Sequence, residues 1–221
     1  MDHHQGRPGR TEGQDLISVI RLFLVALLAA CCCTAAGADG QGEHERRLAA
    51  ELAVMAGDIR RLTSEQGGAL EREGLVKRLS GALSSLPLLL RRAQGEPAPV
   101  AALRTSHQQG DWRRLATQIE MLRKRHPFDA RHLLGAAPTK EVLALGASIH
   151  MSTCAACHDQ PSGADTLLPA KNLAAQLESM PREEFAARLW LGVRGDQSTA
   201  LANPFSAAEL AALIAWYGKT R

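Results

Sequence analysis

Cys154-Ala155-Ala156-Cys157-His158 is the stretch of sequence on which the interpretation of this chain depends. It has the form C-x-x-C-H: two thiols lie three positions apart, and a histidine directly follows the second thiol. This pattern is the attachment signature of a c-type haem, because each thiol can add to one vinyl group of the porphyrin and the histidine can then bind the iron. The sequence therefore predicts one covalent haem c, held by Cys154 and Cys157, with His158 as the proximal iron ligand.

Two other kinds of site also use closely spaced cysteines. A thioredoxin-like redox site needs a strand followed by a helix in an α/β domain, and the sequence gives no sign of one. A structural zinc site needs a second pair of ligands, and no cysteine or histidine follows His158 in the chain. Haem attachment is therefore the interpretation that the motif favours.

The composition predicts an all-α protein large enough to bury a core. The chain has 221 residues, of which 45% are hydrophobic but only 4% aromatic. Alanine and leucine are abundant and β-branched residues are scarce, which favours helices. The net charge of +3 gives no indication of nucleic-acid binding. Residues 43–135 hold 16 Lys+Arg against 11 Asp+Glu, a net of +5, which could face an acidic redox partner or simply form solvated helix surfaces.

The first 42 residues have the composition of a targeting segment. Arginines precede the apolar run Leu22–Ala30, and two cleavage sites compete. Ala36-Gly37-Ala38 suits ordinary signal peptidase, whereas Leu28-Ala29-Ala30-Cys31 resembles a lipobox that would leave Cys31 lipidated and tethered to a membrane. An uncleaved anchor over 22–38 is a third possibility. Each alternative exports the rest of the chain, so we expect a periplasmic protein, soluble or tethered by its N-terminus.

Residues 43–135 are predicted to form a helical bundle. Apolar residues recur at steps of three and four in several segments, which is typical of amphipathic helices. Pro87 is expected to kink or end the second helix, and Asp111 to cap the fourth. Met55 and Met121 are interpreted as core residues rather than haem ligands. The apolar series are Leu48, Leu52, Met55, Ile59 and Leu62; Leu75, Leu79, Leu83, Leu86 and Leu90; and Trp112, Leu115, Ile119 and Leu122.

The remaining residues, 136–221, are predicted to form a second domain around the haem motif. Gly146 lies eight positions before Cys154, and His150 lies four positions before it. Ser206 and Glu209 form a capping box at the start of that last helix. Pro181 to Leu191 is expected to be a helix ended by Gly192.

These features resemble a class I cytochrome c over residues 139–221. The resemblance implies an all-α haem domain whose last helix packs an aromatic residue against the first. It also implies that Gly146, at a position where the family usually has glycine, lets these two helices cross at close range. It also implies that Pro169 and Leu173, in the stretch Pro169-Ala170-Lys171-Asn172-Leu173, pack against the haem, and that the Pro169 carbonyl accepts a hydrogen bond from His158. His150 is a departure, because the family usually has an aromatic residue there.

The second departure concerns the sixth iron ligand. The family places a methionine in the loop between the last two helices, but this chain has Leu201 at that position. Three alternatives remain: Met180 binds the iron from an unusual position, the distal side is open, or the ligand comes from the N-terminal half or another protein. The first suits one-electron transfer with a redox partner protein, which we expect of an electron carrier rather than a catalyst. The others suit a five-coordinate haem protein that binds or senses a small ligand, or a haem subunit of a larger oxidoreductase.

Overall fold

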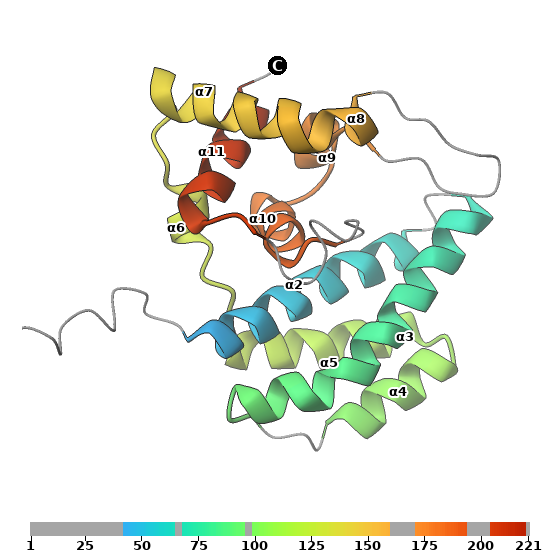
Figure 1. The fold of residues 1–221 in the computed structure, drawn as a ribbon. Coiled ribbons are helices and arrows are strands. Elements are labelled where there is room, and N and C mark those ends of the chain that lie inside the picture. The colour runs from blue at the N-terminus through green and yellow to red at the C-terminus, as the bar shows by residue number, and fades with distance from the viewer. Residues whose placement is uncertain (1–41, 65–67, 96–98, 160–170, 194–203, 220–221) are drawn as a thin grey trace, which may run out of the picture. The chain divides into compact units, whose positions relative to one another are not determined.

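Helices make up the regular structure of this chain. The computed structural model describes residues 42–64, 68–95, 99–159, 171–193 and 204–219, and these ranges contain helices and turns but no strand (Figure 1). The predicted all-α fold is therefore confirmed for the described residues. Gln41–Arg221 form one compact unit.

The first four described helices share one apolar core. They are α2 (Glu43–Thr63), α3 (Ala69–Arg92), α4 (Val100–Gln108) and α5 (Trp112–Arg125), and α2 packs against both α3 and α5. Burying a leucine or isoleucine contributes about 1.5–3 kcal/mol, so this core is the main stabilising feature of the bundle. Its fully buried members come from all four helices: Leu48, Leu52, Met55, Leu79, Leu86, Leu90, Leu103, Leu115 and Ile119.

Pro87 was expected to kink or end α3, and it does not end the helix. The helix continues to Arg92, with Leu86 and Leu90 fully buried on either side of the proline. A proline in a helix lacks the N–H that would bond to the carbonyl four residues earlier, here that of Leu83. Arg104 of α4 donates to this carbonyl through Nη2 at 3.1 Å. The neighbouring helix thus satisfies the acceptor that Pro87 leaves open.

The two methionines of the bundle differ. Met55 is fully buried in the core as predicted, but the prediction for Met121 is wrong because 53% of its surface is exposed. On α5 the buried stripe consists of Leu115, Ile119 and Leu122. Met121 lies beside this stripe and not on it.

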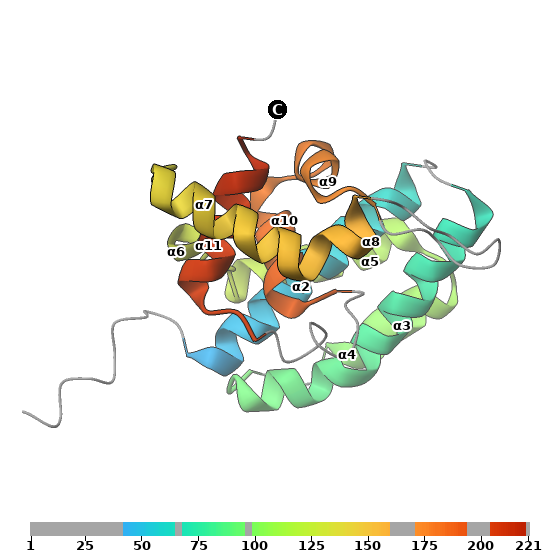
Figure 2. The ribbon, with the colours of Figure 1, turned by 45° about the horizontal axis from the view of Figure 1, so that its top comes forward.

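The second part of the unit contains α6 (Arg131–Leu134), α7 (Lys140–Ile149), a π-helical turn (His150–Cys154), α8 (Ala155–His158), α9 (Leu173–Ser179), α10 (Arg182–Leu191) and α11 (Ala207–Tyr217). Helix α11 packs against α7 and α6, and its apolar residues share a core with residues of α9 and α10 (Figures 1 and 2). This core includes Phe185, Leu210, Leu213, Ile214 and Tyr217.

Helix ends in this part follow the predicted signals. The capping box is present, because Ser206 accepts from the Glu209 backbone and the Glu209 carboxylate accepts from the Ser206 backbone. Gly192 ends α10 with a φ of 62°, in the left-handed region that favours glycine. In the bundle, Asp111 caps α5 by accepting from the Arg114 N–H at 3.0 Å.

Small side chains bring α2 of the bundle against α10. Ala50, Ala53 and Val54 of α2 pack on Ala187 and Leu191 of α10 in a third apolar cluster. None of the described helices is long and apolar enough to cross a membrane. The predicted targeting segment, with Cys31 and both cleavage sites, lies outside the described residues.

Candidate functional site

The cysteines of the motif lie where α7 gives way to a π-helical turn and then to α8. Cys154 ends the π-helical turn and is half-buried, whereas Cys157 is exposed, and neither forms a disulfide. Single π-helical turns are rare in proteins, but those that do occur are often found at functional sites. The turn lies between α7, whose buried residues are Gly146 and Ile149, and α8, which ends at His158.

His158 is held by a hydrogen bond through one ring nitrogen. Its Nδ1 lies 2.7 Å from the Lys171 carbonyl oxygen. A carbonyl can only accept, so Nδ1 carries the proton and Nε2 has a free lone pair, the state in which a histidine binds a metal through Nε2. No hydrogen bond to Nε2 is found within the described residues.

The acceptor of this bond differs from the one expected. We predicted the Pro169 carbonyl, and Pro169 itself lies outside the described residues. The bond goes to Lys171 because this residue directly precedes Asn172, the N-cap of α9, so its carbonyl is not used inside the helix. Asn172 fixes the position by accepting from the Ala175 N–H at 3.0 Å. Leu173, the first residue of α9, is 9% exposed and belongs to the same core against which Cys154 packs.

His150 is buried and lies between two polar partners, the buried Tyr217 and the exposed Asp159. Its Nδ1 lies 2.9 Å from the Tyr217 hydroxyl, and its Nε2 lies 3.0 Å from both carboxylate oxygens of Asp159. The ring also packs on Trp216, with ring centres 4.4 Å apart. His150 lies at the position where the resemblance implies an aromatic residue. Its side chain is only 3% exposed, and both of its ring nitrogens have hydrogen-bond partners.

Tyr217 connects this group to the motif, because its hydroxyl and the Cys154 thiol affect each other's pKa. Burial raises the pKa of Tyr217 far above its ordinary value, and the neighbouring Cys154 and Asp159 act in the same direction. Burial also raises the pKa of the Cys154 thiol, while the hydrogen bond from Tyr217 opposes that rise. The hydroxyl therefore favours the thiolate over the thiol at a position where burial disfavours it.

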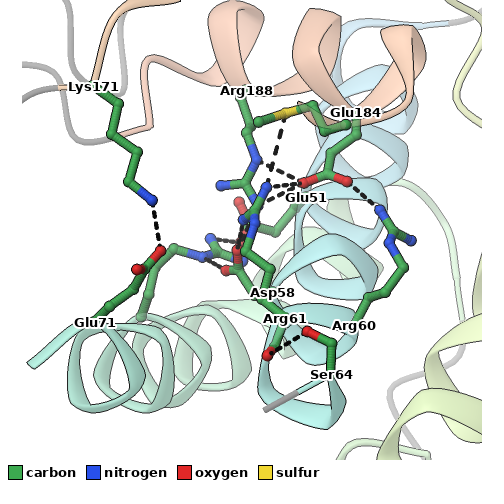
Figure 3. A network of polar contacts seen from close by, with 11 residues as sticks. Glu51, Asp58, Arg60, Arg61, Ser64, Glu71, Lys171, Glu184 and Arg188 are labelled. Carbon is green, nitrogen blue, oxygen red and sulfur yellow. Dashed lines mark hydrogen bonds and ion pairs between the residues drawn. The ribbon is translucent and has the colours of Figure 1, made fainter. Parts of the chain in front are cut away.

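A second group of charged residues joins α2, α3 and α10 (Figure 3). Asp58 is fully buried and Glu184 is 4% exposed. Arg188 pairs with both carboxylates, and Arg61 donates to Glu184 at 2.8 Å and to Asp58 at 3.2 Å. Around them, Arg60 also pairs with Glu184, and Arg78 pairs with Asp58 and Glu51.

These buried charges were missed from the sequence, although one signal was present. Asp58 lies three positions after Met55 and four before Leu62, on the buried stripe of α2, where a charged residue requires a partner. Its partners are three arginines, of which Arg61 and Arg78 lie 3 and 20 positions away, whereas Arg188 lies 130 positions away. Gly57 completes the arrangement, because a Cβ there would lie 2.1 Å from Glu184 Oε1.

Met180 borders this charged cluster. Its sulfur lies 3.8 Å from Arg61 Nη2, and its side chain packs partly buried against the core that contains Leu173 and Phe185. Burial lowers the pKa of Arg61, and the charge of Arg188 adds to this effect. The Met180 sulfur thus lies beside the guanidinium group of Arg61. Leu201 and the rest of the loop 194–203 lie outside the described residues.

Lys171 links the motif to the bundle. Its backbone carbonyl accepts from His158, and its Nζ pairs with Glu71 of α3 at 2.7 Å (Figure 3).

In the described part of the chain, no group of three or more His, Cys, Asp or Glu side chains could hold a metal ion by itself. No family model, curated protein or solved structure matches this chain.

Proposed function

We propose that this protein is a periplasmic monohaem c-type cytochrome that carries out one-electron transfer. The observation that carries the proposal is the bond from His158 Nδ1 to the Lys171 carbonyl at 2.7 Å. This bond fixes the tautomer in which His158 Nε2 can bind iron. His158 also directly follows two free thiols, Cys154 and Cys157, which have the spacing of haem attachment.

The residues present fit a covalent haem. Cys154 and Cys157 would hold it through two thioether bonds, and His158 would bind the iron from the proximal side. Leu173 belongs to the apolar core against which Cys154 packs. The haem would supply the reversible exchange of one electron between ferrous and ferric iron. The Lys171 carbonyl orients the imidazole by accepting from its Nδ1.

Export supports this function, because c-type haem is attached outside the cytoplasm and the first 42 residues read as a targeting segment. The partners of such a protein are other redox proteins. A membrane tether through a lipidated Cys31 or an uncleaved N-terminus would keep it near a membrane-bound partner. The bundle would then be a docking or supporting module, because α2 packs directly on α10.

The test is expression of the full chain in a bacterium that attaches c-type haem. We expect the purified protein to be coloured, to carry the mass of one haem on the peptide with Cys154 and Cys157, and to be reversibly oxidised and reduced. The double variant Cys154→Ala/Cys157→Ala should contain no covalent haem. A colourless parent chain at the mass of the polypeptide alone would overturn the proposal.

A second candidate is a five-coordinate haem protein that binds a small ligand. The contact between the Met180 sulfur and Arg61 favours it, because a thioether engaged beside a guanidinium is not free to bind iron without a rearrangement. A high-spin spectrum of the oxidised protein and ready binding of carbon monoxide to the reduced protein would select this candidate. A low-spin spectrum in both states would select the electron carrier.

A further inference from the structure

The positive charge of the bundle is concentrated in its last two helices. Residues 99–126, which contain α4 and α5, hold six Lys+Arg against two Asp+Glu, a net of +4. This is most of the net of +5 over residues 43–135. Neither acid is free, because Asp111 caps α5 and Glu120 pairs with Arg123 at 3.0 Å. The other basic residues of α5 are therefore left without an acidic partner on their own helix.

Four of these cations lie on the outer face of α5. Arg113, Arg114, Lys124 and Arg125 are exposed, and within the described residues no acidic side chain pairs with any of them. Arg113 and Lys124 are eleven positions apart, as are Arg114 and Arg125, and eleven positions are close to three full turns of an α-helix. The four cations thus form two columns on the side of α5 that faces away from its buried stripe.

Met121 lies in the middle of this outer face. Its side chain is 53% exposed, and it comes seven positions after Arg114 and four positions before Arg125. Cations bind the headgroups of anionic lipids, and an apolar side chain can enter the boundary between headgroups and acyl chains. We call Met121 and the four cations around it the basic face of α5.

The basic face runs to the end of the bundle at which the described chain begins. Helix α5 ends there, beside the start of α2 and the end of α3 (Figures 1 and 2). A Cβ on Gly95 would lie 3.4 Å from the His126 ring, so the last turns of α3 and α5 are in contact. Arg91 and Arg92 add two exposed cations at this end. Residues 43–47 hold two acids and two bases and add no net charge.

The position of the basic face favours a lipid surface as its partner. Cys31, the predicted lipidation site, comes eleven positions before Gly42, where the described chain begins. Eleven residues span at most about 40 Å when fully extended. A membrane that holds Cys31 is therefore within reach of the end of the bundle at which α5 ends. Charge alone suits an acidic protein equally well, but an acidic protein would not require the basic face to lie at this end.

We propose that the basic face of α5 binds the anionic headgroups of a phospholipid membrane. Its four cations contact lipid phosphates, and Met121 enters the boundary with the acyl chains. Each Lys or Arg near an anionic membrane surface strengthens binding about fivefold, so four of them hold a tethered chain against the membrane with one side down. This inference goes beyond the proposed function, because it concerns residues outside the haem motif and requires no haem.

The first experiment identifies the lysines that a membrane covers. The exported full chain is mixed with vesicles of phosphatidylcholine, with or without phosphatidylglycerol, and acetylation of each lysine is followed by mass spectrometry. Lys124 should react at least about fivefold more slowly on the anionic vesicles than on the neutral ones. Lys77 of α3, whose side chain is 76% exposed, is the internal control and should react equally on both.

This comparison is independent of the tether, because a tethered chain binds both kinds of vesicle. Equal reaction of Lys124 on anionic and neutral vesicles would overturn the proposal and leave an acidic protein as the partner of the basic face. Equal slowing of Lys124 and Lys77 on the anionic vesicles would also overturn it, because the membrane would then cover the bundle without regard to α5.

A second experiment removes the charge. It measures, by sedimentation, the ratio of the partition coefficients of the full chain on anionic and neutral vesicles. Replacing all four cations of the basic face by Gln should lower this ratio at least about thirtyfold and make it nearly independent of salt. These side chains are exposed and have no acidic partner among the described residues, so the helix content measured by circular dichroism should not change.

The matched control removes four exposed cations from other parts of the chain. Lys77→Gln, Lys140→Gln, Arg182→Gln and Lys219→Gln together change the net charge by the same amount. The control should keep the ratio of partition coefficients close to that of the parent chain. An equal loss in the two variants would mean that the net charge and not the basic face determines binding, and the assignment to α5 would be wrong.

Met121→Gln separates the apolar contribution from the electrostatic one. It should weaken partition to anionic vesicles several-fold and leave the salt dependence unchanged, because no charge is removed. A change in the salt dependence as large as that of the four-site variant would contradict the role given to Met121. A chain that never acquires haem but passes these tests would overturn the proposed function alone, so the two failures are distinguishable.

Discussion

Gly146 of α7 and Ala212 of α11 approach so closely that a Cβ on Gly146 would lie 2.3 Å from the Ala212 carbonyl oxygen. The same Cβ would lie 2.7 Å from Trp216 Cβ. Because backbone atoms block the space, the helices would have to move apart to admit any side chain. The close crossing also brings Tyr217 within hydrogen-bonding distance of His150. The contact between Tyr217 and His150 therefore depends on this glycine.

We expect Gly146→Ala to lower the free energy of unfolding by about 1–3 kcal/mol or more, the usual cost of overpacking a core. Chemical denaturation of the full chain measures this. Gly81→Ala is the control, because nothing lies within 4 Å of a Cβ at that helical position. There alanine should stabilise the chain by up to about 1 kcal/mol through its higher helix propensity. Equal effects of the two substitutions would contradict the role given to Gly146.

Glu184 is predicted to hold the charged cluster between α2 and α10 together. Glu184→Gln leaves Arg60, Arg61 and Arg188 without one of their acceptors in a site that is almost closed to water. Removing one partner from a buried ionic group typically costs about 3–5 kcal/mol. We expect a loss near the lower end of this range, because half of the Arg60 side chain is exposed (52%).

Glu73→Gln is the matched control for this substitution. Glu73 pairs with Lys77 on the exposed face of α3, where both side chains are more than half exposed. Exposed pairs of this kind contribute little, so denaturation should show no measurable change. If Glu184→Gln is also without effect, the cluster does not stabilise the packing of α2 on α10.

The sequence was sufficient for features that depend on neighbouring residues. The apolar stripe of α2, the Asp111 cap and the Ser206–Glu209 capping box could be predicted, because each depends on local spacing or on a specific residue type. The glycine at the helix crossing was expected only from the resemblance to a family. Met121 was misassigned because spacing on α5 alone does not distinguish the buried stripe from its edge.

Features that depend on distant parts of the chain could not be predicted in this way. The continuation of α3 through Pro87 requires Arg104, which belongs to another helix. The bond from His158 to the Lys171 carbonyl was not predicted, because the start of α9 decides whether that carbonyl is available, and the expected acceptor Pro169 lies outside the described residues. His150 was recognised as a departure from the family, but its partner Tyr217 lies 67 positions away.

Asn172 is predicted to influence the proposed haem iron through its cap on α9. Asn172→Ala removes the bond to the Ala175 N–H and should cost about 1 kcal/mol of stability. It should also loosen the Lys171 carbonyl that accepts from His158. A weaker bond makes the imidazole a poorer donor to ferric iron, so we expect the midpoint potential to rise.

Ser206→Ala separates these two effects. It removes the cap of α11 and should cost a similar amount of stability, but Ser206 has no contact with the Lys171–His158 bond. Its midpoint potential should equal that of the parent protein. Equal shifts of potential in the two variants would mean that loss of a helix cap acts on the iron only through general destabilisation.

Met180→Leu tests whether this methionine binds the proposed iron. Its sulfur lies beside Arg61 Nη2 at 3.8 Å, and its side chain packs on the core. We therefore expect the visible spectrum in both redox states, and the affinity of the reduced protein for carbon monoxide, to be unchanged. The cost in stability should be below about 1.5 kcal/mol, because leucine and methionine have similar volumes.

Met55→Leu shows what the same exchange does at a fully buried position of the bundle, where iron ligation is not in question. If Met180 is the sixth ligand after all, Met180→Leu and not Met55→Leu should remove the near-infrared band of sulfur bound to ferric iron. The same variant should then gain affinity for carbon monoxide, because an apolar side chain would leave the distal position open. That pair of results would mean that Met180 leaves Arg61 when the haem is attached.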